Sequence, residues 1–206
     1  LIQKYITEIE GMIPDNFECE DLSLEEWEQK GLLEFVDLEQ MYFDHVAAHF
    51  DLEAINENSE LVVAYDAMFG AGQSVFPRIM PHAEFLHCEY NPSFHGQAPE
   101  PIAKNLKELE TYLKEMKHAD LAIATDGDAD RLGVVDETGQ FVTQLQVYAL
   151  LALYLLEVRG LRGPLVKSIT TSSMIYRLGE KFDVPVIETD VGFKYIGPAM
   201  IEHDAL

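Results

Sequence analysis

The sequence contains few cysteines and few basic residues, and both shortages argue against whole classes of protein. Its 206 residues include two cysteines, Cys19 and Cys88. These form neither a CxxC pair nor a metal-ligand spacing, so we expect two reduced thiols in a cytoplasmic setting. Fourteen Lys and Arg residues oppose 37 Asp and Glu residues, which gives a formal net charge of −23. Such a surface repels nucleic-acid phosphates and anionic membranes, so we expect neither as a partner.

The sequence also lacks a long hydrophobic run and a secretory leader. Its most apolar segment, residues 145–158, is 14 residues long and contains Gln146. It is too short to span a bilayer, and we expect a buried helix there. No basic region followed by an apolar stretch opens the chain. Because the chain starts at Leu1 rather than Met and stops at "IEHDAL", we expect it to be a fragment of a longer protein.

Short apolar runs alternate with helical patterns, which predicts an α/β fold. We expect strands at residues 60–66, 83–90, 120–126 and 131–136. The clearest helix is expected over residues 99–119, with Pro101 at its start. This order implies right-handed crossovers and a mostly parallel sheet covered by helices on both faces. We therefore predict two three-layer α/β/α domains, 38–140 and an incomplete 141–206, after an acidic segment 1–37.

Three smaller patterns carry expectations of their own. Ser23 and Glu26 have the spacing of a capping box, which predicts a helix N-terminus. His45 and His49 lie four residues apart on a helical pattern; without a third ligand in view, we expect ordinary helical histidines rather than a metal site. Lys167, which follows an apolar run, is expected to be solvated.

The segment "ATDGDADR", residues 124–131, places three carboxylates at alternate positions directly after a strand without polar alternation. The C-terminal edge of such a strand is where ligands bind in open α/β sheets. Gly127 and Ala129 carry no bulk, so the backbone can curl and direct Asp126, Asp128 and Asp130 toward one point. At ~4 Å, each pair of charges costs about 4 kcal/mol at an effective dielectric near 20. The cluster therefore predicts protonation of one carboxylate or a hard divalent cation, Mg²⁺ or Ca²⁺.

Two other interpretations of this segment stay open. The spacing resembles an EF-hand loop, with Glu137 at the twelfth position, but Arg131 occupies the sixth position, where the sharp turn requires glycine. The strands expected on both sides also argue against an EF-hand. The second interpretation is a solvated acidic turn without a ligand.

Arg131 favours a phosphate beside the cation. A guanidinium next to a carboxylate–metal site can hold a phosphate in a bidentate manner. The sequence therefore suggests a phosphoryl-transfer or phosphate-binding site. It contains no GxSxG motif and no P-loop, so it supplies no evident nucleophile.

Four stretches together resemble the α-D-phosphohexomutases, the phosphoglucomutase/phosphomannomutase family. They are "TDGDADRLGVVDETG", "VVAYDAMFGAG", "NPSFHGQAPEPIAKNLKEL" and "TTSSMIYRLGEKFDVPVIETDVGFKYIGPAM". The resemblance covers residues 38–206 and implies Rossmann-like domains: the metal-binding second domain and most of the sugar-recognition third domain. Residues 1–37 would then be a linker from the end of the first domain. The first domain's serine loop and the fourth domain are missing from this chain.

The resemblance also implies an activity. Family members are isomerases that transfer a phosphoryl group from a phosphoserine to a hexose phosphate and take back the other group from the bisphosphate. Expected partners are hexose phosphates and hexose 1,6-bisphosphate, with Mg²⁺ as cofactor and glucose or mannose as the sugar. The chain alone is expected to be inactive, because it lacks the phosphoserine.

Individual roles follow from the same resemblance. Asp126, Asp128 and Asp130 would bind Mg²⁺, and Arg131 would steady the phosphoserine or the transferred phosphoryl group. The substrate-binding residues would be Gly192, Phe193 and Lys194; the alternative for this segment is a strand-to-helix turn with a surface lysine. A structural turn is expected at Asp66, Gly70 and Gly72, where glycine would relieve backbone strain.

Two other functions remain possible from the sequence. One is a non-catalytic α/β module that binds a divalent cation. The other is a phosphatase with Asp126 as nucleophile and Asp128 as acid, although no later Lys or acidic pair is placed to complete such a site.

Overall fold

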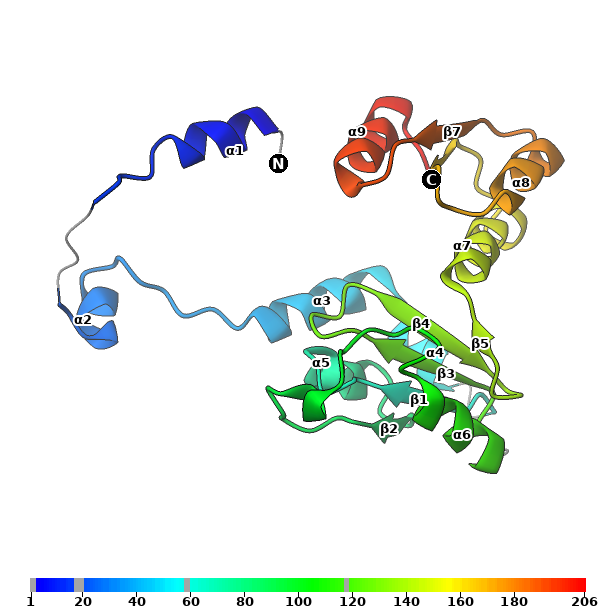
Figure 1. Cartoon of the computed structure of the whole chain (residues 1–206), viewed down its shortest axis with the longest axis horizontal. Helices are drawn as coiled ribbons and strands as arrows, with labels where there is room; N and C mark the ends of the chain where they lie inside the picture. The colour runs from blue at the N-terminus through cyan, green and yellow to red at the C-terminus, as the bar shows by residue number, and fades with distance from the viewer. Residues whose placement is uncertain (1–2, 17–20, 58–59, 117–118) are drawn as a thin grey trace. The chain divides into compact units, whose positions relative to one another are not determined.

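The computed structural model describes residues 3–16, 21–57, 60–116 and 119–206, so Cys19 lies outside the described residues. The chain divides into two units, residues 1–41 and 42–206, and each is described by itself. Figure 1 labels most of their helices and strands. Within the described ranges, no helix has both the length and the apolar character required to cross a membrane.

The first unit contains two short helices, α1 (Gln3–Glu10) and α2 (Leu24–Gln29). The predicted capping box is confirmed at the start of α2. The Ser23 hydroxyl accepts a hydrogen bond from the Glu26 amide at 3.2 Å, and the Glu26 carboxylate accepts one from the Ser23 amide at 2.8 Å. These bonds satisfy amide groups that a helix N-terminus leaves without partners.

The second unit alternates strands and helices along most of its length. The helix α3 (Leu38–His49) begins before the boundary between the units and is followed by α4 (Leu52–Glu57). The elements that build the first sheet are β1 (Val63–Asp66), α5 (Gly72–Ile79), β2 (Glu84–Leu86), a 3₁₀ turn η1 (Phe94–Gly96), α6 (Lys107–Met116), β3 (Leu121–Thr125), β4 (Leu132–Asp136) and β5 (Phe141–Val142). The elements after it are α7 (Gln144–Leu153), a π-helical turn η2 (Tyr154–Val158), β6 (Leu165–Ser168), α8 (Met174–Phe182), β7 (Val186–Thr189) and α9 (Phe193–His203).

The first sheet is mixed, with strand order β2-β1-β3-β4-β5. The pairs β1–β2 and β1–β3 are parallel, whereas β3–β4 and β4–β5 are antiparallel. The α/β class is confirmed, but the expectation of a mostly parallel sheet is wrong here. Residues 126–131 alone connect β3 to β4, and a parallel pairing needs a crossover of about a dozen residues or more.

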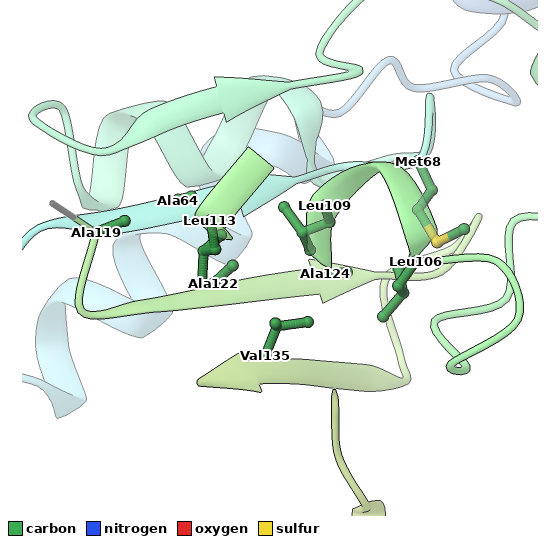
Figure 2. Close-up of a cluster of buried hydrophobic side chains, with 9 residues drawn as sticks. All are labelled: Ala64, Met68, Leu106, Leu109, Leu113, Ala119, Ala122, Ala124 and Val135. Atoms are coloured by element: carbon green, nitrogen blue, oxygen red, sulfur yellow. The ribbon is translucent and has the colours of Figure 1, made fainter. Parts of the chain in front are cut away.

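Leucines that precede or belong to α6 form the core on one face of this sheet. Figure 2 shows Leu109 and Leu113 directed toward the small side chains of β3. Ala122 and Ala124 are fully buried in that strand, and their small size lets the helix approach the sheet closely. Each fully buried leucine stabilises the fold by about 1.5–3 kcal/mol relative to an exposed one. Residues 126–130, which follow β3, therefore start from a strand that is held firmly in place.

The opposite face of β1 packs on α5. Successive side chains of a strand point to opposite faces, so Ala64 contributes to the core under α6 while Tyr65 points the other way. The Tyr65 ring stacks on Phe76 of α5 at 3.8 Å between centroids. Helices thus cover both faces of the first sheet, as the sequence predicts.

The helix α6 begins six residues later than Pro101, where the sequence places its start. The side chain of Asn105 explains the difference, because its Nδ2 donates to the carbonyls of Glu100 at 2.9 Å and Ala98 at 3.4 Å. These bonds hold residues 98–105 in a loop instead of a first helical turn. Helix formation therefore starts at Lys107.

The second sheet contains two parallel strands, β6 and β7, with Lys167 opposite Glu188 in the register. Its core is a cluster from α7, η2, β6, α8 and the connection before β7, consisting of Ala152, Leu156, Leu165, Ile175, Leu178 and Val184. A second capping box begins α7, because the Thr143 hydroxyl accepts from the Gln146 amide and the Gln146 side chain accepts from the Thr143 amide. The helix predicted over residues 144–159 is present as α7 and η2 together. The expectation that this apolar segment is buried is wrong, because Ala152 and Leu156 are buried whereas Leu145, Leu150, Leu151, Tyr154 and Val158 are exposed.

Candidate functional site

The aspartate loop, residues 126–130, begins where β3 ends and brings its three carboxylates together. One oxygen from each of Asp126, Asp128 and Asp130 lies within 4.8 Å of the others. Asp126 is fully buried, whereas Asp128 and Asp130 are exposed. The left-handed residue that curls the loop is Ala129, with φ of 62°. The sequence attributes the curl to Gly127 and Ala129 together, but Gly127 has no positive φ. A Cβ atom on Gly127 would lie 3.1 Å from Pro99 Cγ, so a side chain there would have to displace that proline.

Arg131 is bonded to the buried aspartate at two points. Its amide donates to Asp126 Oδ1 at 2.9 Å, and its Nε donates to Oδ2 at 2.6 Å. Burial acts to raise the pKa of the Asp126 carboxyl, but these hydrogen bonds and the guanidinium charge together hold that pKa below its ordinary value. Asp126 is therefore ionised at neutral pH despite its burial.

The guanidinium also contacts two further carboxylates. Nη1 donates to Glu100 at 3.3 Å, and Nε lies 3.8 Å from Asp130 Oδ1. Three aspartates and Arg131 give the loop two excess negative charges, and Glu100 adds a third beside it. A divalent cation would balance the excess charge of the loop.

The donor set also suits a hard cation. All three groups offer carboxylate oxygen, which Mg²⁺, Ca²⁺ and Mn²⁺ prefer over softer ligands. Each carboxylate oxygen has two lone pairs, so Asp126 can accept its bonds from Arg131 and still contribute a ligand. The arrangement could hold a metal ion, and no other group of three such ligands occurs within the described ranges. His45 and His49 are exposed and belong to no such group there.

Two alternative interpretations of the loop fit the structure poorly. An EF-hand requires flanking helices, whereas the loop lies between β3 and β4, and Glu137 is not among the clustered ligands. A phosphatase nucleophile requires an accessible carboxylate. Asp126 is fully buried and bonded through both oxygens to Arg131.

The turn between β1 and α5, residues 70–72, lies directly against the aspartate loop. We call it the glycine turn. A Cβ atom on Gly70 would lie 2.6 Å from the Asp126 carbonyl oxygen, and one on Gly72 would lie 1.9 Å from the Tyr65 hydroxyl. The expectation that these glycines relieve backbone strain is wrong, because neither has a positive φ. The left-handed residues of this segment are Met68 (φ 47°) and Phe69 (φ 61°), so the glycines are required by close packing.

A cavity of about 670 Å³ is lined in part by residues 97–99 of the loop before α6. Its wall includes His87, whose Nδ1 lies 2.9 Å from Asp66 and whose Nε2 lies 3.4 Å from Glu108. The hydrogen bond with Asp66 raises the pKa of His87 above its ordinary value, against the opposing effect of partial burial. The described lining does not include the loop aspartates, so the cavity itself is not the cation site.

The residues expected to read the sugar follow β7. Gly192 has φ of 127°, which glycine tolerates and other residues do not, and it is the residue immediately before α9. Phe193 is 77% exposed, and the Lys194 ammonium lies 4.9 Å from the centroid of the Tyr195 ring. An exposed aromatic ring and an exposed lysine that follow a strand's carboxyl end can contact a ligand. The same geometry fits a strand-to-helix turn with a surface lysine, so the substrate role stays a prediction.

Lys167 is buried, so the expectation of a solvated lysine is wrong. Its side chain is 2% exposed, and Nζ lies 2.6 Å from Glu188 Oε2. The Tyr176 hydroxyl donates to the same oxygen at 2.6 Å. The bonds from Lys167 and then from Tyr176 lower the pKa of the Glu188 carboxyl. A buried ammonium requires such a partner, and the strand register supplies it.

Sequence reasoning also missed Glu100 and the approach of the glycine turn to the aspartate loop. Glu100 belongs to a segment that the sequence assigns to a helix, and no local pattern pairs it with Arg131. The approach joins Gly70 to Asp126 and Gly127 across the sheet. The closely spaced glycines at 70 and 72 were the available signal for it.

Comparison with known protein families gives two matches that together span most of the chain. Residues 40–139 match the model described as phosphoglucomutase/phosphomannomutase, alpha/beta/alpha domain II. Residues 144–206 match the model for alpha/beta/alpha domain III of the same family.

Individual relatives agree with these matches. The chain is 30% identical over 201 residues to a phosphoglucomutase/phosphomannomutase of Thermococcus kodakarensis, which covers 96% of this chain and 43% of that relative. It is 35% identical over 150 residues to a phosphopentomutase of the same organism, covering 71% of this chain and 33% of the relative. A crystal structure of a protein from Thermus thermophilus, assigned as a phosphomannomutase, superposes with a TM-score of 0.84 at 34% identity. That match covers 99% of this chain and 46% of the other. The chain thus spans less than half the length of each of these proteins.

Proposed function

Because the chain belongs to the phosphoglucomutase/phosphomannomutase family, we propose that the protein containing it interconverts a hexose 1-phosphate and a hexose 6-phosphate. A phosphoserine outside this chain gives its phosphoryl group to the free hydroxyl of the hexose phosphate. The resulting hexose 1,6-bisphosphate returns its other phosphoryl group to the serine. The reaction is an isomerisation, since the number of phosphoryl groups on enzyme and sugar is the same before and after.

The observation that carries this proposal is the cluster of three carboxylate oxygens within 4.8 Å at the end of β3. We assign Asp126, Asp128 and Asp130 as ligands of Mg²⁺. When bound, the cation neutralises charge on the transferred phosphoryl group, which is the main requirement of phosphoryl-transfer catalysis. The chemistry of the donor set supports this assignment, because Mg²⁺ prefers carboxylate oxygens and commonly shares them with a phosphate.

Arg131 is assigned a catalytic role as the cation next to the transferred group. Its contacts with Asp126 and Glu100 hold the guanidinium beside the loop. A guanidinium has five N–H donors and can keep a carboxylate bond while it donates to a phosphate oxygen. Arg131 would therefore both hold Asp126 and steady the phosphoryl group.

The segment after β7 is assigned to the substrate. Gly192, Phe193 and Lys194 would contact the sugar phosphate, with the lysine as the charged group and the backbone of Gly192 as the close-approach point. The exposure of Phe193 and Lys194 and the positive φ of Gly192 support this assignment. We propose glucose, mannose or both as the sugar. The relatives carry several substrate names, so the chain supports the sugar-phosphate class more strongly than any one sugar.

We propose the following division of the chain: residues 1–37 form a linker, 38–140 the metal-binding domain and 141–206 part of the sugar-recognition domain. The two family matches, 40–139 and 144–206, support this division. The serine loop and the phosphate-binding domain would be supplied by other parts of the same polypeptide. The coverage of less than half of each relative supports that expectation.

A coupled assay on the polypeptide extended by the serine loop and fourth domain tests the function. Glucose 1-phosphate and mannose 1-phosphate are supplied separately, with the corresponding 1,6-bisphosphate, and formation of the 6-phosphate is followed. We expect turnover that falls at least about 100-fold in Asp128→Asn, since positioned charge of this kind is worth two or more orders of magnitude. Glu137→Gln is the matched control, because it removes an exposed carboxylate at the other end of β4 that does not belong to the cluster. Hydrolysis of phosphate monoesters by residues 1–206 alone, without isomerisation by the extended protein, would instead favour the phosphatase.

A further inference from the structure

The glycine turn touches the backbone of the aspartate loop. The Ala71 amide donates to the Gly127 carbonyl at 3.0 Å. A Cβ atom on Gly70 would lie 2.6 Å from the Asp126 carbonyl oxygen and 2.9 Å from the Gly127 Cα and carbonyl oxygen. All three are backbone atoms, which cannot rotate away as a flexible side chain can. Any side chain at position 70 must therefore displace the loop or the turn.

The loop is held from a second direction by residues 98–105. The Gly127 amide donates to the Pro99 carbonyl at 3.2 Å. The Asn105 side chain in turn binds the Ala98 and Glu100 carbonyls on either side of Pro99. Gly127, the residue between the ligands Asp126 and Asp128, is thus bonded through its amide to one segment and through its carbonyl to another.

From this geometry we propose that Gly70 is a positioning residue for the cation site. The atoms nearest to a Cβ at position 70 are backbone atoms and not ligand carboxylates. The absence of a side chain at Gly70 sets how closely the glycine turn approaches the loop backbone from which Asp126 and Asp128 extend. Its φ is not positive, so conformational freedom does not explain the glycine and the close approach does. This inference rests on the proposed cation-binding function of the loop.

The consequence is a loss of cation affinity when a methyl group is added at position 70. Outer-shell groups that orient metal ligands contribute about 10–100-fold to metal affinity. We expect Gly70→Ala to weaken binding by a factor in this range. We also expect faster hydrogen exchange at the Gly127 amide in metal-free protein, because the bond to Pro99 is disturbed when the loop shifts.

The test measures Mn²⁺ binding by water-proton relaxation in the 206-residue chain, with Mn²⁺ as a paramagnetic substitute that takes the same oxygen ligands. Gly139→Ala is the matched control. A Cβ there would lie 2.7 Å from the Glu110 carbonyl oxygen, and the residue has φ of 74°, so the control is also strained and tightly packed. It lies in the turn between β4 and β5, at the other end of β4 from the aspartate loop. The inference predicts a loss of affinity in Gly70→Ala and unchanged affinity in Gly139→Ala.

The outcomes separate this inference from the function on which it rests. If wild-type protein shows no saturable Mn²⁺ binding, the proposed cation site is wrong. The same holds if binding is saturable but Asp128→Asn does not remove it. If wild-type protein binds and Gly70→Ala binds equally well, only the positioning role is overturned. Should Gly70→Ala fail to fold, Ala71→Pro replaces it. Proline can adopt the φ of −64° at position 71, and it has no amide N–H, so the hydrogen bond to the Gly127 carbonyl is removed. Wild-type affinity in folded Ala71→Pro, or failure of both variants to fold, would overturn the positioning role.

Discussion

Replacing single aspartates of the loop is expected to change the stability of the metal-free domain in opposite directions. Asp126 is fully buried and accepts bonds from the Arg131 amide and Nε. Asp126→Asn keeps one acceptor oxygen and replaces the other with an NH₂ group. This group is a donor facing the guanidinium, which is also a donor, so one of the two hydrogen bonds is lost. Hydrogen bonds to charged groups contribute about 1.5–3 kcal/mol, so we expect the free energy of unfolding to fall by about that amount.

Asp128→Asn is expected to have the opposite effect, because that side chain is exposed and surrounded by like charges. Two unit charges separated by 4.8 Å, the limit that encloses the cluster, repel by about 0.9 kcal/mol in water. Asp128 makes two such pairs, with Asp126 and Asp130, and its attraction to Arg131 offsets part of the repulsion. We therefore expect metal-free Asp128→Asn to be more stable than wild type by about 1 kcal/mol at low ionic strength, and by less in salt.

Hydrogen exchange of peptides that cover β3 and β4 measures both effects. Trp27, the only tryptophan, belongs to α2 of the first unit, so peptide-level exchange is preferred because it is read from the strands themselves. The variants are compared in EDTA and then with excess Mg²⁺, which should protect wild type by mass action and leave Asp128→Asn unchanged. Equal destabilisation by both substitutions would refute the argument, since the three carboxylates would then act as ordinary structural acceptors.

Two further predictions concern titratable groups outside the loop. The pKa of His87 is raised from 6.5, chiefly by its hydrogen bond with Asp66. The protonated ring therefore stabilises the fold fully below pH 6.5. This stability is lost as the pH rises through the raised pKa. Thermal unfolding from pH 6 to 9 should show this decline in wild type and not in His87→Gln; a parallel decline in the variant would assign it to another group. The bond with Glu188 raises the pKa of the Tyr176 hydroxyl. Glu188→Gln should therefore lower that pKa toward 10.0, as followed by NMR of the labelled tyrosine ring, and an unchanged titration would show that the bond is not formed in solution.

Features that depend on neighbouring residues could be predicted from the sequence. The alternation of Asp126, Asp128 and Asp130 after an apolar strand places the carboxylates together, because strand and loop are continuous in the chain. The capping box of Ser23 and Glu26 is local in the same sense. The α/β class follows from patterns of apolar residues that do not depend on distant contacts.

Features that depend on contacts between distant segments could not be predicted. The burial of Lys167 is decided by Glu188, which the parallel register of β6 and β7 places opposite it. The late start of α6 is decided by the Asn105 side chain, which competes with the helix for carbonyl groups. The direction of β4 is a different case, because the short connection between β3 and β4 is a local feature. It excludes a parallel crossover, so the antiparallel pairing could have been predicted from the sequence.

The most direct test of the central claim is a titration of the 206-residue chain with Mg²⁺, followed through the backbone amide NMR signals of residues 126–131. Because the phosphate that would complete the coordination lies outside this chain, we predict weak saturable binding, with Kd on the order of millimolar. The shifts should centre on the aspartate loop, be abolished by Asp128→Asn and be retained in Glu137→Gln. Shifts of equal size spread over acidic residues elsewhere in the chain, or unaffected by Asp128→Asn, would contradict the account, because the loop would then be only one part of a generally acidic surface.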